Sequence, residues 1–382
     1  LTVGQLAITG NGAGQNYGVM DLNDGSVTMS GSGGWLIWGW QGGYGVLNLF
    51  GGSITSPPGN DTAMHHTLNR STFGILNLLG PNALLNTAVN AHSVNLAEQA
   101  GNAGSVVNLN AGTLVANKVF SGAPSTPTFF NFGGGTLKAN TSQSQFLQSL
   151  TYATVYPGGA VIDSSTTSVQ IAQCLLSPTD YGVSGIGLLY GGLGYIGAPV
   201  VVISGGSGTG ATAIASVDLS PSSPTCGQVT GITVTSPGFG YQAGDTVLVS
   251  LRGGGYTNNA VALAYNATLA PNSSAGGLKK LGVGSLTLSG TNTYGGATIV
   301  QEGTLVPAHN LALPAAAPLQ LTGGTLDLNG LTLTSGVLTA QSGFVGGGTL
   351  ACAGLVKTGT GKLVVGAPLA IGGPVQILEG TL

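Results

Sequence analysis

An internal repeat near the C-terminus constrains the fold of this 382-residue chain more than any other feature. Residues 277–305 align without a gap on residues 354–382, and 12 of the 29 aligned residues are identical. The tripeptide Gly-Thr-Leu closes both copies and occurs six times in the chain, with several spacings between 21 and 24 residues. A unit of this length cannot bury its apolar side chains alone, so the repeated units must stack on one another.

A second repeat occupies the N-terminal part of the chain. Val-Leu-Asn-Leu, Ile-Leu-Asn-Leu and Val-Val-Asn-Leu place Asn48, Asn77 and Asn108 at spacings of 29 and 31 residues. If these segments stack in register, the three side chains form an amide ladder.

Composition restricts the fold to β-structure. Gly makes up 69 of 382 residues, too many for long helices, while apolar residues alternate with polar ones in short pieces that end in Gly or Asn. We therefore predict an all-β fold, a right-handed parallel β-helix (β-solenoid) with a small inserted β domain. At about 25 residues per coil, roughly 12 coils would give a rod about 55 Å long.

Charge is scarce, with 8 Lys or Arg, 11 Asp or Glu and a net charge of −3. Such a chain lacks the clustered cations that nucleic-acid binding requires. No apolar run is long and uninterrupted enough for a membrane-spanning helix. We expect neither a nucleic-acid partner nor a membrane span in this chain.

Three regions are predicted. Residues 1–180 form N-terminal coils and residues 270–382 form C-terminal coils. Between them, residues 181–269 form an inserted module with its own 46-residue repeat, in which Gly-Leu-Gly-Tyr at 192–195 recurs as Gly-Phe-Gly-Tyr at 238–241. We expect this module to project from the rod.

The C-terminal repeat carries a family resemblance. Residues 282–305 combine alternating leucines, the turn Ser-Gly-Thr-Asn-Thr-Tyr-Gly-Gly and a closing Gly-Thr-Leu. This pattern resembles the passenger-associated β-strand repeat of bacterial autotransporters, and the inserted Gly-x-Gly-Tyr repeat resembles small β modules of bacterial surface proteins and phage fibres. The resemblance implies an exported β-helical stalk or adhesin with no catalytic residues. The copy at 359–382 lacks Asn-Thr-Tyr, so its corner is expected to differ.

The aromatic cluster Trp35, Trp38, Trp40 and Tyr44 is a candidate interaction patch, because Trp is enriched in sugar-binding platforms and in subunit contacts. Packing in the core or at an end of the rod is the alternative. Of the three cysteines, Cys174 and Cys226 flank much of the insert and are a candidate disulfide. Sequons for glycosylation occur at Asn60, Asn69, Asn140, Asn266 and Asn272.

Catalytic and metal-binding signals are weak. The acidic residues are mostly isolated, and their pattern indicates turn caps rather than a catalytic pair. His65 and His66 are adjacent, so in a strand they would point in opposite directions rather than converge on a metal. We expect no catalytic residue, metal or cofactor.

These observations predict an exported structural β-solenoid, extracellular or at the bacterial cell surface. It would form a stalk or filament by stacking end to end on itself or on further coils of a longer chain. Two alternatives remain: an adhesin that binds a glycan or host protein through the insert or the Trp segment, and a β-helical polysaccharide-active enzyme.

Overall fold

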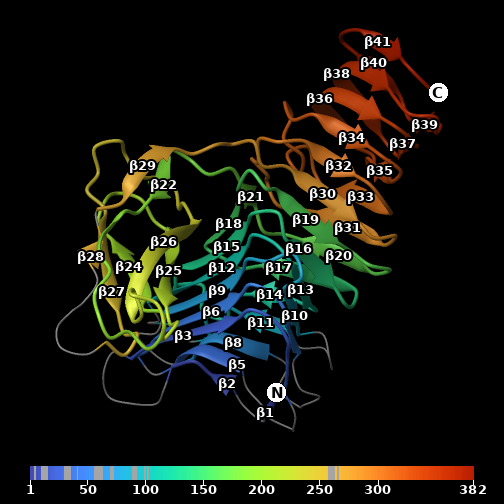
Figure 1. Cartoon of the computed structure of the whole chain (residues 1–382). Coiled ribbons are helices and arrows are strands. Elements are labelled where there is room, and N and C mark those ends of the chain that lie inside the picture. The colour runs from blue at the N-terminus through green and yellow to red at the C-terminus, as the bar shows by residue number, and fades with distance from the viewer. Residues whose placement is uncertain are drawn as a thin grey trace.

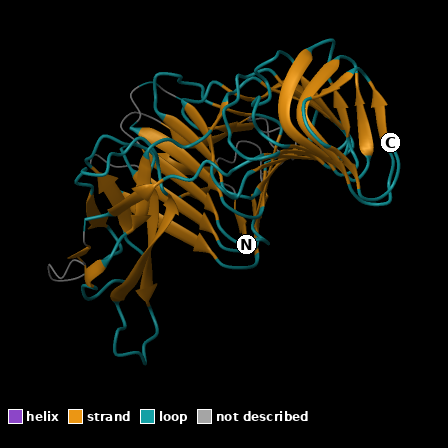
Figure 2. Cartoon of the chain, turned by 90° about the horizontal axis from the view of Figure 1, so that it is seen from above, coloured by secondary structure: helices purple, strands orange, loops and turns teal. Residues whose placement is uncertain are grey.

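The computed structural model describes residues 1–3, 6–9, 16–29, 36–40, 42–55, 63–68, 73–87, 93–98, 100, 103–256, 263–264 and 266–382. Within these residues every regular element is a β-strand (Figure 2). Most strands stack in parallel into coils, so the predicted parallel β-helix is confirmed (Figure 1). No helix in the described part of the chain has the length and apolar character needed to cross a bilayer.

Two parallel sheets run the length of the rod. Sheet A contains β1 (Thr2–Val3), β4 (Ser26–Met29), β7 (Ser53–Thr55), β10 (Leu84–Asn86), β13 (Thr113–Ala116), β16 (Thr136–Ala139), β19 (Ala160–Asp163), β30 (Leu278–Leu281), β32 (Thr298–Val300), β34 (Leu319–Leu321), β36 (Thr332–Ala340), β38 (Thr349–Lys357), β40 (Leu369–Ile371) and β41 (Val375–Ile377). Sheet B contains β2 (Leu6–Ala7), β5 (Leu36–Trp40), β8 (Ala63–Leu68), β11 (Ser93–Asn95), β14 (Val119–Phe120), β17 (Gln143–Gln148), β20 (Ser168–Ile171), β31 (Ser285–Leu288), β33 (Thr304–Pro307), β35 (Thr325–Asp327), β37 (Gly343–Gly346) and β39 (Leu363–Gly366).

A third parallel sheet is confined to the N-terminal coils. Sheet C contains β3 (Tyr17–Leu22), β6 (Tyr44–Leu49), β9 (Phe73–Leu78), β12 (Gly104–Leu109), β15 (Thr128–Phe132), β18 (Tyr152–Val155) and β21 (Leu175–Leu176). Each N-terminal coil therefore has three sides, one from each sheet. Sheets A and B continue beyond the insert, because β19 pairs with β30 and β20 pairs with β31.

The rod is held together by ladders of apolar side chains that face inward. In sheet C, Leu47, Leu76, Val107 and Phe130 occupy equivalent register positions and are fully buried. Stacking identical positions about 4.8 Å apart lets each coil bury the apolar side chains of its neighbours. Twelve such steps along sheet A, from β1 to β40, correspond to a path of roughly 58 Å.

Where sheet C ends, a turn takes the place of its strand. Asn292 accepts a hydrogen bond from the backbone N–H of Leu175 through Oδ1 (2.7 Å) and donates one to Ala312 O through Nδ2 (2.7 Å). Tyr294 is fully buried, and its hydroxyl lies 2.7 Å from Thr298 Oγ1. In the second copy the corner differs as expected: the corresponding residues form β40, which pairs with β38.

The inserted module contains β22 (Tyr181–Gly185), β23 (Leu188–Tyr190), β24 (Val200–Ser204), β25 (Thr212–Asp218), β26 (Gln228–Ser236), β27 (Leu248–Arg252), β28 (Leu263–Ala264) and β29 (Thr268–Pro271). Its main sheet is antiparallel, in the order β26-β25-β24-β27. The repeated Gly-x-Gly-Tyr turns are alike in conformation: Gly192 and Gly238 have φ of 68°, and both are followed by a second left-handed glycine and a buried tyrosine.

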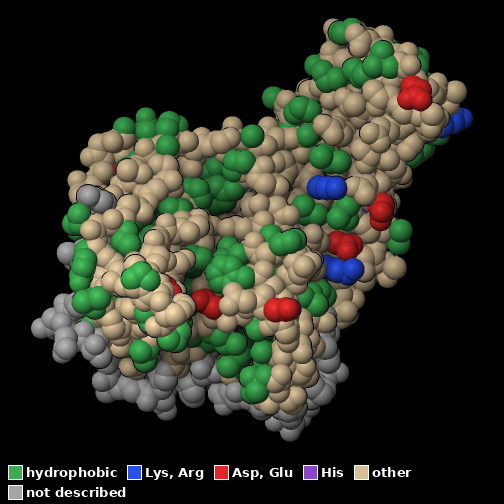
Figure 3. Space-filling view, viewed as in Figure 1, with side chains coloured by type: hydrophobic (Ala, Val, Ile, Leu, Met, Phe, Trp, Pro, Cys, Tyr) green, Lys and Arg blue, Asp and Glu red, His purple; other side chains and the backbone are tan. Residues whose placement is uncertain are grey.

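The expectation that this module projects from the rod is wrong. It folds back over the outer face of sheet C, where Val46, Ile75, Val106 and Phe129 form an apolar cluster with Val200 of β24. The physical reason lies in the sheet C strands, which carry apolar side chains on both faces and need a cover on the outside as well as the inside. Figure 1 shows the insert beside sheet C, and Figure 3 shows few charged side chains on the side of the molecule seen in that view.

Candidate functional site

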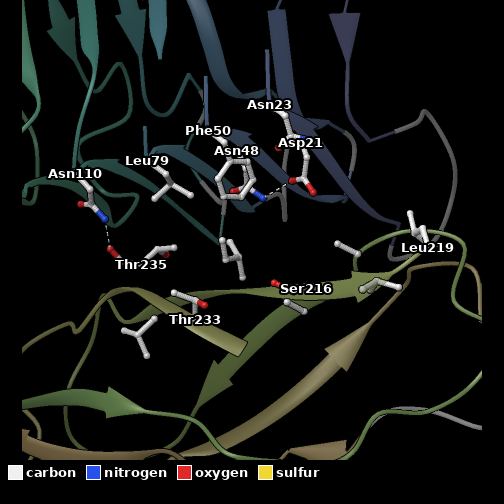
Figure 4. A pocket seen from close by; sticks show the side chains of 15 residues that line it. Asp21, Asn23, Asn48, Phe50, Leu79, Asn110, Ser216, Leu219, Thr233 and Thr235 are labelled. Carbon is white, nitrogen blue, oxygen red and sulfur yellow. Dashed lines mark hydrogen bonds between the residues drawn. The ribbon is translucent and has the colours of Figure 1, made fainter. Parts of the chain in front are cut away.

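A groove lies between the insert and the rod (Figure 4). One wall comes from sheet C and the turns that follow its strands, and the other from β25 and β26 of the insert. The cavity measures about 630 Å³. We call it the interface groove, and define it by Asp21, Asn23, Asn48, Phe50, Leu79, Asn110, Ser216, Leu219, Thr233 and Thr235 together with the small apolar residues between them.

A ladder of amide side chains runs along the outer face of sheet C and ends at this groove. Each Asn donates through Nδ2 to the preceding rung: Asn77 to Asn48 and Asn108 to Asn77, both at 2.7 Å. The ladder predicted from the Leu-Asn-Leu repeat is therefore present. It extends one rung further at each end, because Asn131 donates to Asn108 (2.8 Å) and Asn48 donates to Asp21 Oδ1 (2.7 Å).

The direction of the ladder gives Asp21 a defined place. Every donor points toward the N-terminal coil, so the chain of hydrogen bonds ends on a carboxylate, which accepts more strongly than an amide oxygen. Asn48 is only 2% exposed, whereas Asp21 is exposed to the groove. The buried rungs thus hold one oxygen of the Asp21 carboxylate, and the other oxygen has no hydrogen-bond partner among the described residues.

The last two amide rungs of the ladder, Asn108 and Asn131, fasten the insert to the rod. Asn108 Nδ2 also donates to Thr212 Oγ1 (2.8 Å), and Asn131 Nδ2 donates to Ser236 Oγ (3.1 Å). Asn110 donates to Thr235 O at the edge of the groove (2.7 Å). These bonds join strands far apart in sequence and fix the separation of the two walls.

An aromatic row lies beside the ladder on the same face of sheet C. Tyr44 stacks on Phe73 with ring centroids 4.6 Å apart and lies 5.9 Å from Tyr17. Burial, with a smaller contribution from Tyr17, raises the pKa of Tyr44 to about 12. Burial likewise raises the pKa of Tyr156, despite the contact of its hydroxyl with Ser236. These phenols are neutral structural groups.

A different set of polar residues forms the corners of the C-terminal repeats. Lys280 is fully buried and donates through Nζ to the carbonyls of Leu281 (2.8 Å), Gly282 (2.6 Å) and Glu302 (3.2 Å). Burial lowers its pKa to about 8, against the opposing effects of Asp163 and Glu302. Lys357 makes the same three bonds in the second copy, at 2.8, 2.6 and 3.2 Å, to Thr358, Gly359 and Glu379. We call each arrangement a lysine cage.

Both lysine cages lie in segments that match a family model. Residues 278–306 and 355–382 match the model described as passenger-associated-transport-repeat. Each of these two segments is similar to the passenger-associated transport repeat. No curated protein and no solved structure matches the chain. The resemblance seen in the sequence is thus confirmed for these two segments, and the first of them spans two successive coils of the parallel β-helix, from β30 to β33.

The described members of the predicted aromatic patch belong to two different strands. Trp38 and Trp40 belong to β5 in sheet B, whereas Tyr44 belongs to β6 in sheet C and stacks beneath the insert. Trp35 lies outside the described residues, and the interface groove contains no Trp from the described chain. An interaction role for the Trp segment stays a prediction.

The structure does not form the candidate disulfide. Cys174, Cys226 and Cys352 are all free, with Cys226 exposed and Cys352 buried. Cys174 lies in the coil that ends sheet C, while Cys226 lies in the β25–β26 connection.

The predicted glycosylation sites differ in their surroundings. Asn60 and Asn69 lie outside the described residues, and Asn266 is exposed. Asn140 donates to Asn117 Oδ1 (3.2 Å), and Asn272 donates to Thr179 O and Gly238 O, both at 3.0 Å. Asn272 therefore anchors the chain where it returns from the insert.

Two groups of residues were missed in the sequence. The groove residues Asn23, Phe50 and Asn110 follow sheet C strands, and nothing in the sequence places the insert opposite them. Lys280 and Lys357 were visible as identical repeat positions, which was a signal for a shared structural role.

His65 lies in β8, opposite Ile37 of β5 in the register of sheet B. In the described chain, no three His, Cys, Asp or Glu side chains gather as a metal site would require.

Proposed function

We propose that this chain is an exported structural β-solenoid, extracellular or at the bacterial cell surface, which extends by stacking coils end to end and has no catalytic activity. The match to the passenger-associated transport repeat supports export, because the description of this family refers to a transported passenger. The continuity of sheets A and B supports a structural role, since it builds one rod from residues throughout the chain.

The observation that carries the proposal is the unbroken parallel pairing of sheet A, in which each coil stacks on the next from β1 to β40. Within the described residues, β40 and β41 pair on one side only, with β38. Val375 and Ile377 of β41 are 51% and 54% exposed, whereas the residues of β38 that pair with them are buried. Such an edge offers unpaired backbone groups and apolar side chains to another coil.

The other end of the rod offers the complementary edge. In the described chain, β1, β2 and β3 pair on one side only, with β4, β5 and β6. Contact between unlike ends does not close on itself and so propagates a linear assembly. A coil from a second copy and a further coil from the same polypeptide would use the same edge.

Self-assembly of the purified chain tests this proposal. We expect analytical ultracentrifugation to show concentration-dependent association and negative-stain microscopy to show particles extended along the rod axis. The double variant Val375→Lys/Ile377→Lys should remain monomeric, because charge at a β-edge opposes pairing. Val283→Lys, at an exposed corner on the side of the rod, is the matched control and should assemble as the wild type does.

Two results would contradict stacking through this edge. One is a wild-type chain that stays monomeric at all concentrations, and the other is equal assembly by the edge variant and the wild type. Hydrolysis or elimination activity on a polysaccharide would contradict the structural assignment itself.

A further inference from the structure

We propose that the interface groove binds a neutral oligosaccharide. This binding site goes beyond the structural role, since a rod needs no ligand to stack its coils. The groove is fixed on both sides by the hydrogen bonds between the Asn ladder and the insert, so its walls exist before any ligand arrives. Its volume of about 630 Å³ lies within the range of small-molecule sites.

The charge of the lining selects against anionic ligands. Among the described residues that line the interface groove, Asp21 is the one carboxylate, and none is Lys, Arg or His. A sulfated or sialylated glycan, or a phosphate ester, would bring negative charge to Asp21 with no cation to compensate it. A neutral polyol meets no such penalty.

The polar groups of the groove match the hydroxyl groups of a sugar. Asn48 holds Asp21 Oδ1 at 2.7 Å, which leaves Asp21 Oδ2 to accept from a ligand hydroxyl. On the described part of the chain, the side chains of Asn23, Ser216 and Thr233 make no hydrogen bond and are exposed. Acceptors and donors thus face the cavity from both walls (Figure 4). Hydroxyl groups can do both, which suits this mixed lining.

An aromatic ring provides the apolar part of the site. Phe50 is 38% exposed and lies between the polar groups of the rod wall, and Leu79 and Leu219 flank the same cavity. The C–H face of a pyranose ring is apolar and packs on an aromatic face, while its hydroxyl groups point sideways to polar partners. A ring next to a carboxylate, an amide and hydroxyls is the combination that a neutral saccharide requires.

Titration calorimetry on the whole chain tests the proposal. The probes are the neutral tetrasaccharides maltotetraose, cellotetraose and mannotetraose, with 3′-sialyllactose and a heparin tetrasaccharide as anionic comparisons. We expect saturable binding of at least one neutral probe and none of the anionic ones. Phe50→Ala should weaken binding by about tenfold, the loss expected for one stacking contact.

Two further variants separate binding from folding. Thr233→Val removes one exposed hydroxyl from the insert wall at constant volume and should weaken binding severalfold without changing the thermal transition. Phe344→Ala is the matched control, because Phe344 is also 38% exposed but lies in β37, outside the groove lining. It should bind as the wild type does.

Three outcomes would overturn the proposal. They are the absence of binding by every neutral probe at millimolar concentration, equal binding by Phe50→Ala and Phe344→Ala, and preferential binding of an anionic probe. None of them bears on end-to-end stacking, which is measured by assembly, so the two proposals fail separately.

Discussion

At the scale of single residues, the lysine cages show how a buried ammonium group can stabilise the corner of a stacked coil. Among the described residues, Lys280 has no carboxylate within bonding distance and instead donates to three carbonyls of its own corner. Gly282, with φ of 76°, turns one of these carbonyls toward the ammonium group. The sequence predicted the repeat but not the burial of Lys280, because a Lys in an alternating strand usually lies at the surface. Only the geometry of the corner shows that all three protons are used.

Replacement of Lys280 by Met should therefore destabilise the first repeat. Lys280→Met keeps the apolar stem but leaves three carbonyls without their donor, at a cost of about 3 kcal/mol. Hydrogen exchange over residues 278–307 measures this as a loss of protection in that coil. Lys279→Met is the control, because Lys279 is the adjacent residue, points away from the core and should change stability by less than about 0.5 kcal/mol.

The pH dependence of stability provides a second test of the same residue. The pKa of Lys280 is about 8 in the folded chain and near its ordinary value of 10.5 when unfolded. Between these values the unfolded chain binds the proton and the folded chain does not, so the free energy of unfolding rises with pH. The urea midpoint of the wild type, measured relative to that of Lys280→Met, should therefore increase from pH 8 upward. If the difference between the two urea midpoints stayed constant across this pH range, the lowered pKa of the buried Lys280 would be contradicted.

At the scale of elements, part of the site could be predicted from sequence spacing. The Leu-Asn-Leu repeat placed Asn48, Asn77 and Asn108 on one ladder, because equal positions of stacked strands must meet. It did not reveal the end rungs, since Asp21 lies in Met-Asp-Leu and Asn131 in Phe-Asn-Phe. The periodicity of the strand, rather than the identity of the flanking residues, decides which side chains meet.

The turn that replaces sheet C depends on one amide side chain. Asn292→Ala should remove the acceptor of the Leu175 N–H and the donor to Ala312 O, which leaves two backbone groups unpaired. We expect a loss of about 2 kcal/mol, since each buried unpaired group costs about 1 kcal/mol or more. Asn310→Ala, at an exposed position of the next coil, should have little effect. Hydrogen exchange at residues 172–176 and 308–313 makes the comparison, and equal protection in the two variants would show that the amide is dispensable.

At the scale of the whole molecule, the sequence predicted a rod with an insert but not where the insert lies. The missed signal is the adjacent apolar pair in each sheet C strand, such as Val46 with Leu47 or Ile75 with Leu76. A strand with one face in solvent alternates apolar and polar residues, whereas these strands have both faces covered. The cover comes from a segment far along the chain, as the bond between Asn108 and Thr212, 104 residues apart, shows, and no local pattern specifies such a contact.

The docking of the insert can be tested by placing one charge in its contact with sheet C. Val200 is 1% exposed and packs against Val46, Ile75, Val106 and Phe129, so Val200→Asp would bury an unpaired carboxylate. Undocking avoids that cost, which is several kcal/mol for a charge in an apolar contact. We therefore expect a larger radius of gyration in small-angle X-ray scattering and faster hydrogen exchange on the outer face of sheet C, with sheets A and B unchanged. Leu248→Asp, at an exposed position of β27, should leave the scattering profile as it is.

If Val200→Asp kept the wild-type profile, the apolar contact would not hold the insert. If sheets A and B lost protection as well, the insert would be part of the rod's own stability rather than a cover laid over a finished β-helix.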